Sequence, residues 1–447
     1  MQRDSALARM SRNIAWGLGS RGFNSVAGIA YLALAARTLG PKSFGEFVLI
    51  LTYGQLIANF VQFQSWKGVI RYGSLHLADK QPDRLHRLFG YTATLDVGSA
   101  LFGALIAAVG APIVAPLFHW TPHQQMSAAL FGTVLLLTTG ATATGMLRLF
   151  NRFDLVAYAE AVGPLVRLGG CVIAWLAGGH IDAFLVIWGA AGVAQAAVQW
   201  VAALLAGKAR LAVGPTHFRR GAEENEGIWR FMVQTNISNS ISTFWLQLGT
   251  MAVGAVAGAA DAGAFRLAQR LAKGIVRPVR PITIALYPEL ARMVANKNHS
   301  ELRKMVLHAT VAASGIAVLV VLVTSVAGRE ILSLLAGKNF EFAYVYLLLL
   351  SVATALDLAG IAFEPLQDAN GRAGTVLRAR SVAAVAYAIL LATLLPWLGG
   401  QGAAIAAIVC SALIFVQLAR ASATILKDVP GPAAVPARGQ AERTSVT

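Results

Sequence analysis

Long apolar segments constrain the fold of this chain more than any other feature. A helix crosses a bilayer with about 20 mostly apolar residues, and the 447-residue sequence contains twelve such segments, most of them joined by short connections. Charged residues make up only 13% of the chain, against about 25% in soluble domains. The sequence therefore predicts an all-α polytopic membrane protein with about twelve transmembrane helices. The expected spans are 13–36, 44–66, 88–117, 125–150, 154–177, 181–206, 230–257, 263–291, 305–327, 341–365, 376–397 and 401–425.

The longest internal polar connection, residues 207–229, divides these spans into two sets of six. We expect an N-terminal six-helix bundle over 1–206, a cytoplasmic linker over 207–229 and a C-terminal six-helix bundle over 230–425. Residues 426–447 are polar and rich in Pro and Ala, which predicts a disordered tail because such a segment has little apolar surface to bury.

The distribution of positive charge predicts the orientation of the chain. Most of the 37 Lys and Arg residues fall in segments outside the spans on the same side as the N-terminus. Loops rich in Lys and Arg stay in the cytoplasm, so both termini are expected there, in the inner membrane of a bacterium. This asymmetry also accounts for most of the net charge of +16, so no nucleic acid partner is needed to explain it. The opposite side holds only Arg37, Lys42, Arg329 and Lys338.

An internal repeat supports the division into halves. The stretches "LGPKSFGEF" and "AGAADAGAF" share the pattern Gly-x4-Gly-x-Phe at an offset of 218 residues, and the same offset relates Arg12 to Arg230. Six spans per half preserve orientation, so we expect the halves to be related by an axis along the membrane normal, with a central cavity between them. The repeated residues are Gly40, Gly45 and Phe47 in the first half, and Gly258, Gly263 and Phe265 in the second.

Residues 265–281, "FRLAQRLAKGIVRPVRP", carry a stripe of positive charge inside an expected span. The cations recur at spacings of four and three residues, so a helix places them all on one face. Facing lipid, five cations would cost about 12–17 kcal/mol. We therefore predict that the stripe lines a wet cavity and binds an anion, because guanidinium groups bind phosphate oxygens in pairs. The alternative is a stripe that lies mainly at the membrane surface, where long side chains reach water. The cation stripe comprises Arg266, Arg270, Lys273, Arg277 and Arg280.

The repeat offset extends the predicted cavity to three more spans. It relates Lys273, Arg277 and Arg280 to polar positions in the second span, and it relates polar positions in the first span to the seventh. We expect these polar faces to meet. The predicted polar lining consists of Asn24, Gln55, Asn59, Gln62 and Asn239, and Arg21 joins the predicted cationic residues.

The acids inside the spans leave two roles open. Asp96, Asp357 and Glu364 are either charge partners of the cation stripe or sites of ion coupling, since buried carboxylates can take up protons. Acids are fewer than cations, so the cavity is expected to be net positive. The two cysteines provide no disulfide framework, and no metal or cofactor is expected.

The stretches "LAARTLGPKSFGEFVLI", "AGAFRLAQRL" and "LYPELARM" resemble those of prokaryotic oligosaccharide flippases, the polysaccharide-biosynthesis (Wzx-type) branch of the multidrug/oligosaccharidyl-lipid/polysaccharide exporter superfamily. The resemblance implies a flippase that moves an oligosaccharide linked to undecaprenyl pyrophosphate from the cytoplasmic to the periplasmic leaflet by alternating access, for surface polysaccharide assembly. The implied partners are the lipid-linked oligosaccharide, membrane lipids and a polysaccharide polymerase.

Two details of the resemblance bear on the site. Arg21 and Arg270 resemble cavity arginines of the lipid II flippase branch, whose fourteen spans differ from the twelve expected here and speak against a peptidoglycan role. Related chains often carry an Asp in the seventh span, where this chain has "FWLQLG".

Two other functions remain as alternatives. A multidrug or metabolite exporter of the same fold would need an acidic cavity to bind cationic compounds, whereas the excess charge here is positive. A membrane polysaccharide polymerase or ligase usually has a large outer loop with catalytic residues, and the expected outer loops here are short. We therefore expect a transporter rather than an enzyme.

Overall fold

The computed structural model describes residues 6–207, 211–212, 214–276, 286, 289–290, 292–294, 296 and 299–427, and these fold into helices joined by short turns. Within the described residues, nine segments are long and apolar enough to cross a membrane, and the first, Gly22–Ala78, holds two of the expected spans. The predicted all-α polytopic class is confirmed. The number twelve stays a prediction, since α10, which carries the described part of the cation stripe, is not among the nine segments.

The helices of the first half follow the expected spans closely. Two short helices, α2 and α8, lie in segments that the predicted topology places in the cytoplasm. They are α1 (Ala6–Val61), α2 (Ser65–Ala78), α3 (Pro82–Phe118), α4 (Pro122–Leu137), α5 (Ala141–Leu149), α6 (Phe153–Leu176), α7 (Ile181–Gly207) and α8 (Pro215–Glu223).

The second half repeats this arrangement, and its last described helix ends at Lys427, so most of the expected tail lies outside the described residues. Its elements are α9 (Ile228–Val256), α10 (Ala259–Val276), α12 (His299–Ala336), the 3-10 helix η2 (Lys338–Ala343), α13 (Tyr344–Ala359), α14 (Phe363–Ala369), α15 (Ala373–Leu398) and α16 (Gly400–Lys427).

The repeated glycines break the chain at equivalent points in the two halves. Gly40 divides α1 into two expected spans with φ 71° and ψ 171°, and Gly258 separates α9 from α10 with φ 96°. Positive φ angles suit glycine because it has no Cβ. The connections between neighbouring spans at these two points are therefore shorter than the sequence predicts, because a single glycine is enough to turn the chain back.

The fourth and tenth expected spans are each broken into two helices. The first break separates α4 from α5 at residues 138–140, and the second separates α13 from α14 at residues 360–362. At the first break, Trp200 Nε1 donates a hydrogen bond to the carbonyl oxygen of Thr139 at 2.9 Å. Interrupted helices are tolerated at membrane depth where neighbouring protein satisfies the freed backbone groups. Each expected span, 125–150 and 341–365, still falls almost wholly within one segment long and apolar enough to cross a membrane, Pro122–Leu149 and Lys338–Ala369.

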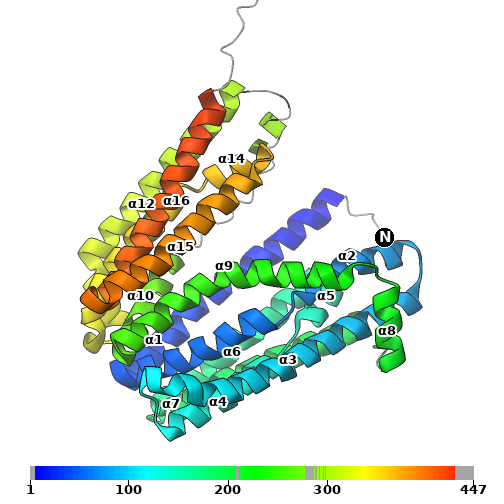
Figure 1. The fold of residues 1–447 in the computed structure, drawn as a ribbon, viewed down its shortest axis with the longest axis horizontal. Coiled ribbons are helices and arrows are strands. Elements are labelled where there is room, and N and C mark those ends of the chain that lie inside the picture. The colour runs from blue at the N-terminus through cyan, green and yellow to red at the C-terminus, as the bar shows by residue number, and fades with distance from the viewer. Residues whose placement is uncertain are drawn as a thin grey trace, which may run out of the picture.

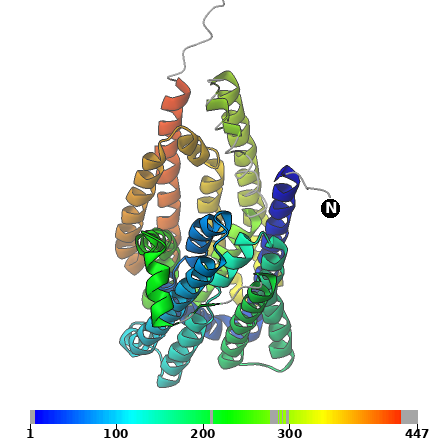
Figure 2. The ribbon, with the colours of Figure 1, turned by 90° about the vertical axis from the view of Figure 1, so that its right-hand side faces the viewer.

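The two halves form two arms of a V (Figure 1). The arms meet at one end, and both the start of α1 and the end of α16 lie at the open end of the V. Figure 2 shows the same separation after a quarter turn, with the orange and red helices of the second half above the cyan helices of the first. The first part of α1 runs between the arms (Figure 1).

Two elements near the middle of the chain dock on the first half. In α9, Asn236 Nδ2 donates to the carbonyl oxygen of Phe60 at 2.9 Å, and Ser240 Oγ donates to that of Asn59 at 2.6 Å. The helix α8 lies within the expected linker and packs Phe218 on Tyr91 with ring centroids 4.7 Å apart. The start of the second half is thus held by the first half.

The closed end of the V depends on a contact between the repeated glycines. A Cβ atom placed on Gly45 would lie 1.8 Å from the carbonyl oxygen of Ala259, and one placed on Gly263 would lie 2.8 Å from the Cα atom of Gly45. The backbones of α1 and α10 therefore touch, as small residues allow in membrane helices. Phe47 and Phe265, the last residues of the repeat, are both fully buried beside this contact.

We expect Gly45→Ala to destabilise the protein by about 1–3 kcal/mol, the typical effect of overpacking, because the clashing atoms belong to the backbone of α10. The measurement is the midpoint of thermal unfolding of the purified protein. Gly98→Ala in α3 is the matched control, since no atom lies within 4 Å of a Cβ placed there. Equal midpoints for the two variants would contradict the close contact.

Candidate functional site

Three helices converge on the side chain of Arg266. Its Nη1 donates to Gln269 Oε1 at 3.2 Å, and its Nη2 donates to Gln55 Oε1 at 3.3 Å. Gln247 of α9 donates to the same oxygen of Gln55 at 3.1 Å. The structure thus brings together α1, α9 and α10 through one arginine and three glutamines.

Arg270 lies one turn further along α10 and packs against the first part of α1. A Cβ atom placed on Gly28 would be 2.3 Å from Arg270 Nη2, so the guanidinium occupies the space that a side chain at position 28 would fill. One turn later, a Cβ on Gly274 would lie 2.7 Å from Ile29 Cδ1. These contacts place the guanidinium of Arg270 against protein and not against lipid.

The charges of Arg266 and Arg270 are not neutralised by nearby acids. Within the described part of the chain, no carboxylate oxygen lies within 4.0 Å of either guanidinium, whereas ion pairs form elsewhere, such as Arg87 with Glu224 and Arg148 with Glu160. A guanidinium at the centre of a bilayer costs about 2.5–3.5 kcal/mol even on insertion scales. Neutral amide oxygens solvate Arg266, so its positive charge is kept. We call Arg266, Arg270, Gln55, Gln247 and Gln269 the cationic cluster.

The rest of the cation stripe differs from these two arginines. Lys273 is exposed, and it lies within electrostatic range of Asp357, which is also exposed. Arg277 and Arg280 lie outside the described residues. The uncompensated charge in the described structure therefore centres on Arg266 and Arg270.

Asp96 and Glu364 are held by partners away from the stripe. Asp96 is buried and accepts hydrogen bonds from the Ser65 hydroxyl, from the Thr142 amide at 3.0 Å and from the Thr142 hydroxyl at 2.7 Å. Glu364 forms a two-pronged ion pair with Arg380 at 2.8 and 3.0 Å. Asp96 thus joins α3 to the starts of α2 and α5, and Glu364 joins α14 to α15.

The predicted polar lining is only partly assembled. Gln55 contacts Arg266 directly, whereas Gln62 donates to the carbonyl oxygen of Leu136 at 3.3 Å. The carbonyl oxygen of Asn59 accepts from α9, and Asn24 Oδ1 is buried without a hydrogen-bond partner. The side chains of Arg21 and Asn239 lie outside what the structure describes.

Sequence analysis missed the two other glutamines of the cluster. Gln269 follows Arg266 by three residues, which places both on one face of α10. Gln247 follows Asn236 and Ser240 by eleven and seven residues, the spacing of one helical face. Both could have been found from helical periodicity, without the repeat offset that led to Gln55.

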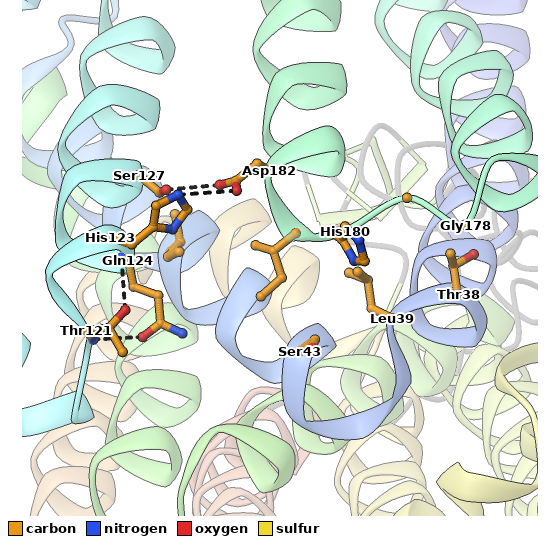
Figure 3. Close-up of a pocket in the computed structure, with 13 residues that line it drawn as sticks. Thr38, Leu39, Ser43, Thr121, His123, Gln124, Ser127, Gly178, His180 and Asp182 are labelled. Carbon is orange, nitrogen blue, oxygen red and sulfur yellow. Dashed lines mark hydrogen bonds and ion pairs between the residues drawn. The ribbon is translucent and has the colours of Figure 1, made fainter.

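A separate pocket of about 420 Å³ lies at the closed end of the first half (Figure 3). Asp182 at the start of α7 pairs with His123 at 3.5 Å and accepts a hydrogen bond from Ser127 at 3.1 Å. In the described ranges, no group of three His, Cys, Asp or Glu residues is placed to hold a metal ion. The described arginines of the stripe do not line this pocket, so it is distinct from the cationic cluster.

Solved structures define the class to which this fold belongs. The chain superposes on an inward-facing multidrug resistance transporter of the MATE family with a TM-score of 0.63, covering 96% of this chain and 100% of that one at 16% identity. It superposes on the lipid II flippase MurJ in an inward closed conformation with a TM-score of 0.65, covering 92% and 87% at 12% identity. The fold is that of the MOP superfamily of flippases and exporters.

Sequence comparison narrows this class to a family. The chain belongs to the polysaccharide biosynthesis protein family, whose model matches residues 10–294. It is 28% identical over 348 residues to the inner membrane protein YghQ of Escherichia coli (strain K12), covering 76% of this chain and 96% of that protein. The chain thus combines membership of this family with apolar helices long enough to cross a membrane and a fold shared with the MATE transporter and MurJ.

We expect Asp96→Asn to lower the stability of the protein by about 1.5–3 kcal/mol, because an amide loses at least one of the three hydrogen bonds to the carboxylate. Thermal unfolding of the purified protein measures this change. Asp182→Asn is the control, since its side chain is 56% exposed and surface changes stay within about 0.5 kcal/mol. A loss of transport with unchanged stability would instead indicate a coupling role for Asp96.

Proposed function

We propose that the protein flips an oligosaccharide linked to undecaprenyl pyrophosphate from the cytoplasmic to the periplasmic leaflet by alternating access, for surface polysaccharide assembly. The observation that supports this most directly is the pair Arg266 and Arg270: glutamine oxygens accept hydrogen bonds from Arg266, Arg270 packs against Gly28, and neither has a described acid partner. Such a pair attracts an anion, which cannot cross the lipid tails unaided.

The chemistry of the cluster suits both parts of this substrate. Each guanidinium offers paired donors that match phosphate oxygens. The glutamines add amide groups, and Gln247 Oε1 is buried without a partner, as is Asn24 Oδ1. Both acceptors are covered in this structure, and we propose that they receive sugar hydroxyl groups when the helices around them part. The cluster therefore combines an anion site with acceptors for a glycan.

The position of the cluster favours entry from the cytoplasm. We propose that both termini are cytoplasmic, as the positive charge of the loops predicts, and the V opens on their side (Figure 1). Arg266 and Arg270 follow Gly263 by three and seven residues, which is about 4.5 and 10.5 Å along a helix. The arginines thus lie just inside the glycine contact that closes the other end. A polysaccharide polymerase would act on the glycan after its delivery.

The positive charge of the cluster also separates this proposal from an exporter of cationic drugs. A cationic compound would be repelled by Arg266 and Arg270, and the described acids Asp96 and Glu364 are held by other partners. Binding of a cationic dye by the purified protein, without binding of polyprenyl pyrophosphates, would favour the exporter.

Complementation of a bacterial strain that lacks its oligosaccharide flippase tests the proposal. We expect the wild-type protein to restore surface polysaccharide and Arg270→Ala to reduce it at least tenfold, since a hydrogen bond to a charged group contributes about 1.5–3 kcal/mol. Arg219→Ala is the control, because Arg219 is exposed on α8 and pairs with Glu223. Wild-type levels of polysaccharide from Arg270→Ala would remove the proposed role of this arginine.

A second variant distinguishes the charge of the cluster from its packing. Gln55→Glu keeps the shape of the side chain and gives Arg266 a carboxylate partner, so we expect unchanged or higher thermal stability together with a loss of polysaccharide transport. Gln124→Glu is the control, since Glu and Gln serve equally at this position of a capping box. Full transport by Gln55→Glu would show that the cluster needs no net positive charge.

A further inference from the structure

Arg167 of α6 lies near the middle of the apolar segment Phe153–Leu176, which is long enough to span a membrane. Its central carbon lies 5.7 Å from the ring centroid of Tyr31 and 5.7 Å from that of Trp188. The two rings contact each other edge to face, with centroids 5.2 Å apart at an interplanar angle of 90°. Aromatic faces attract a cation, but they offset only part of the cost of burying it and satisfy none of its N–H donors.

Among the residues that the structure describes, none accepts a hydrogen bond from Arg167. Its Nε atom is buried without a hydrogen-bond partner, and in the described part of the chain no carboxylate oxygen lies within 4.0 Å of its guanidinium. Glu160, an acid on the same helix, is occupied by Arg148 at 3.8 Å and by the Ser20 hydroxyl at 2.9 Å. Arg167 therefore resembles Arg266 and Arg270 in carrying a charge without an acid partner.

The first part of α1 links Arg167 to the cationic cluster. Arg270 reaches α1 at Gly28 from the second half, and Arg167 reaches it at Tyr31 from the first. Gly28 and Tyr31 are three residues apart and so lie on the same face of α1. Tyr31 also lies within electrostatic range of Arg266. The guanidinium groups thus flank one turn of α1 from the two arms of the V.

We propose that Arg167 is the anion-binding residue of the first half, and that the two phosphate groups of a polyprenyl pyrophosphate bridge Arg167 and Arg270. This inference rests on the proposed function and extends it, because the cation stripe lies entirely in the second half. Each guanidinium binds one phosphate group with paired donors. The aromatic pair holds the guanidinium of Arg167 in place without neutralising it.

The bridge has two consequences for binding. A pyrophosphate engages both arginines, whereas a monophosphate engages one at a time, so the site favours pyrophosphate-linked lipids. The bridge also joins the two arms, since α6 belongs to the first half and α10 to the second, so binding resists their separation.

Binding of short polyprenyl phosphates to the purified full-length protein tests this inference. The probes are farnesyl pyrophosphate and farnesyl phosphate, with farnesol as the uncharged control. We expect the wild-type protein to prefer the pyrophosphate. We expect Arg167→Gln to weaken pyrophosphate binding about tenfold, the effect of one lost charge-assisted hydrogen bond, and to change monophosphate binding less. Arg152→Gln is the control, because Arg152 precedes α6 and pairs with Asp154 at 3.0 Å.

The outcomes separate this inference from the proposed function. Normal pyrophosphate preference in Arg167→Gln, together with its loss in Arg270→Ala, would overturn the bridge and leave the flippase proposal intact. Equal binding of all three probes by the wild-type protein would overturn both. If Arg167→Gln does not fold, Arg167→Lys is tested in its place. Lys keeps the positive charge over the rings but lacks the paired donors. This variant should lose the pyrophosphate preference, and retained preference would overturn the bridge.

Discussion

The proposed site of this membrane protein depends on how guanidinium groups are solvated. A buried guanidinium uses its N–H donors only where acceptors surround it, and these can be carboxylate or amide oxygens. Carboxylates would stabilise the helices but would cancel the charge. The structure uses Gln55 and Gln269 for Arg266. These hydrogen bonds hold Arg266 in place without neutralising it, so the site keeps the positive charge that the proposed anion binding requires.

The repeat could be predicted from sequence because its physical demands are local. Gly40 and Gly258 adopt positive φ angles, and Gly45 and Gly263 allow backbones to touch, so the sequence records each requirement at one position. The breaks in the fourth and tenth spans could not be predicted in this way. The break between α4 and α5 relies on Trp200, which lies about sixty residues further along the chain and supplies the missing donor.

The same contrast applies to the candidate site. Residues marked by local spacing were predicted, and contacts made by residues distant in sequence were not. Charge spacing identified Arg266 and Arg270, and the repeat offset identified Gln55. Counting charges did not reveal which acids were already engaged: Asp96 is bound by Ser65 and Thr142, both distant in sequence. Arg167 was visible as a cation within a span, but its unused donors became apparent only when Tyr31 and Trp188 were found around it.

The glycine contact at the closed end has a mechanical consequence. Where two helices meet through side chains, ridges sit in grooves, and a change in crossing angle requires those side chains to disengage and repack. Gly45 and Gly263 present bare main chain to each other. Because no side chains of these two glycines interlock, a change in the crossing angle of α1 and α10 costs little at this contact. We therefore expect the two arms to rotate about this point, next to the buried side chains of Phe47 and Phe265.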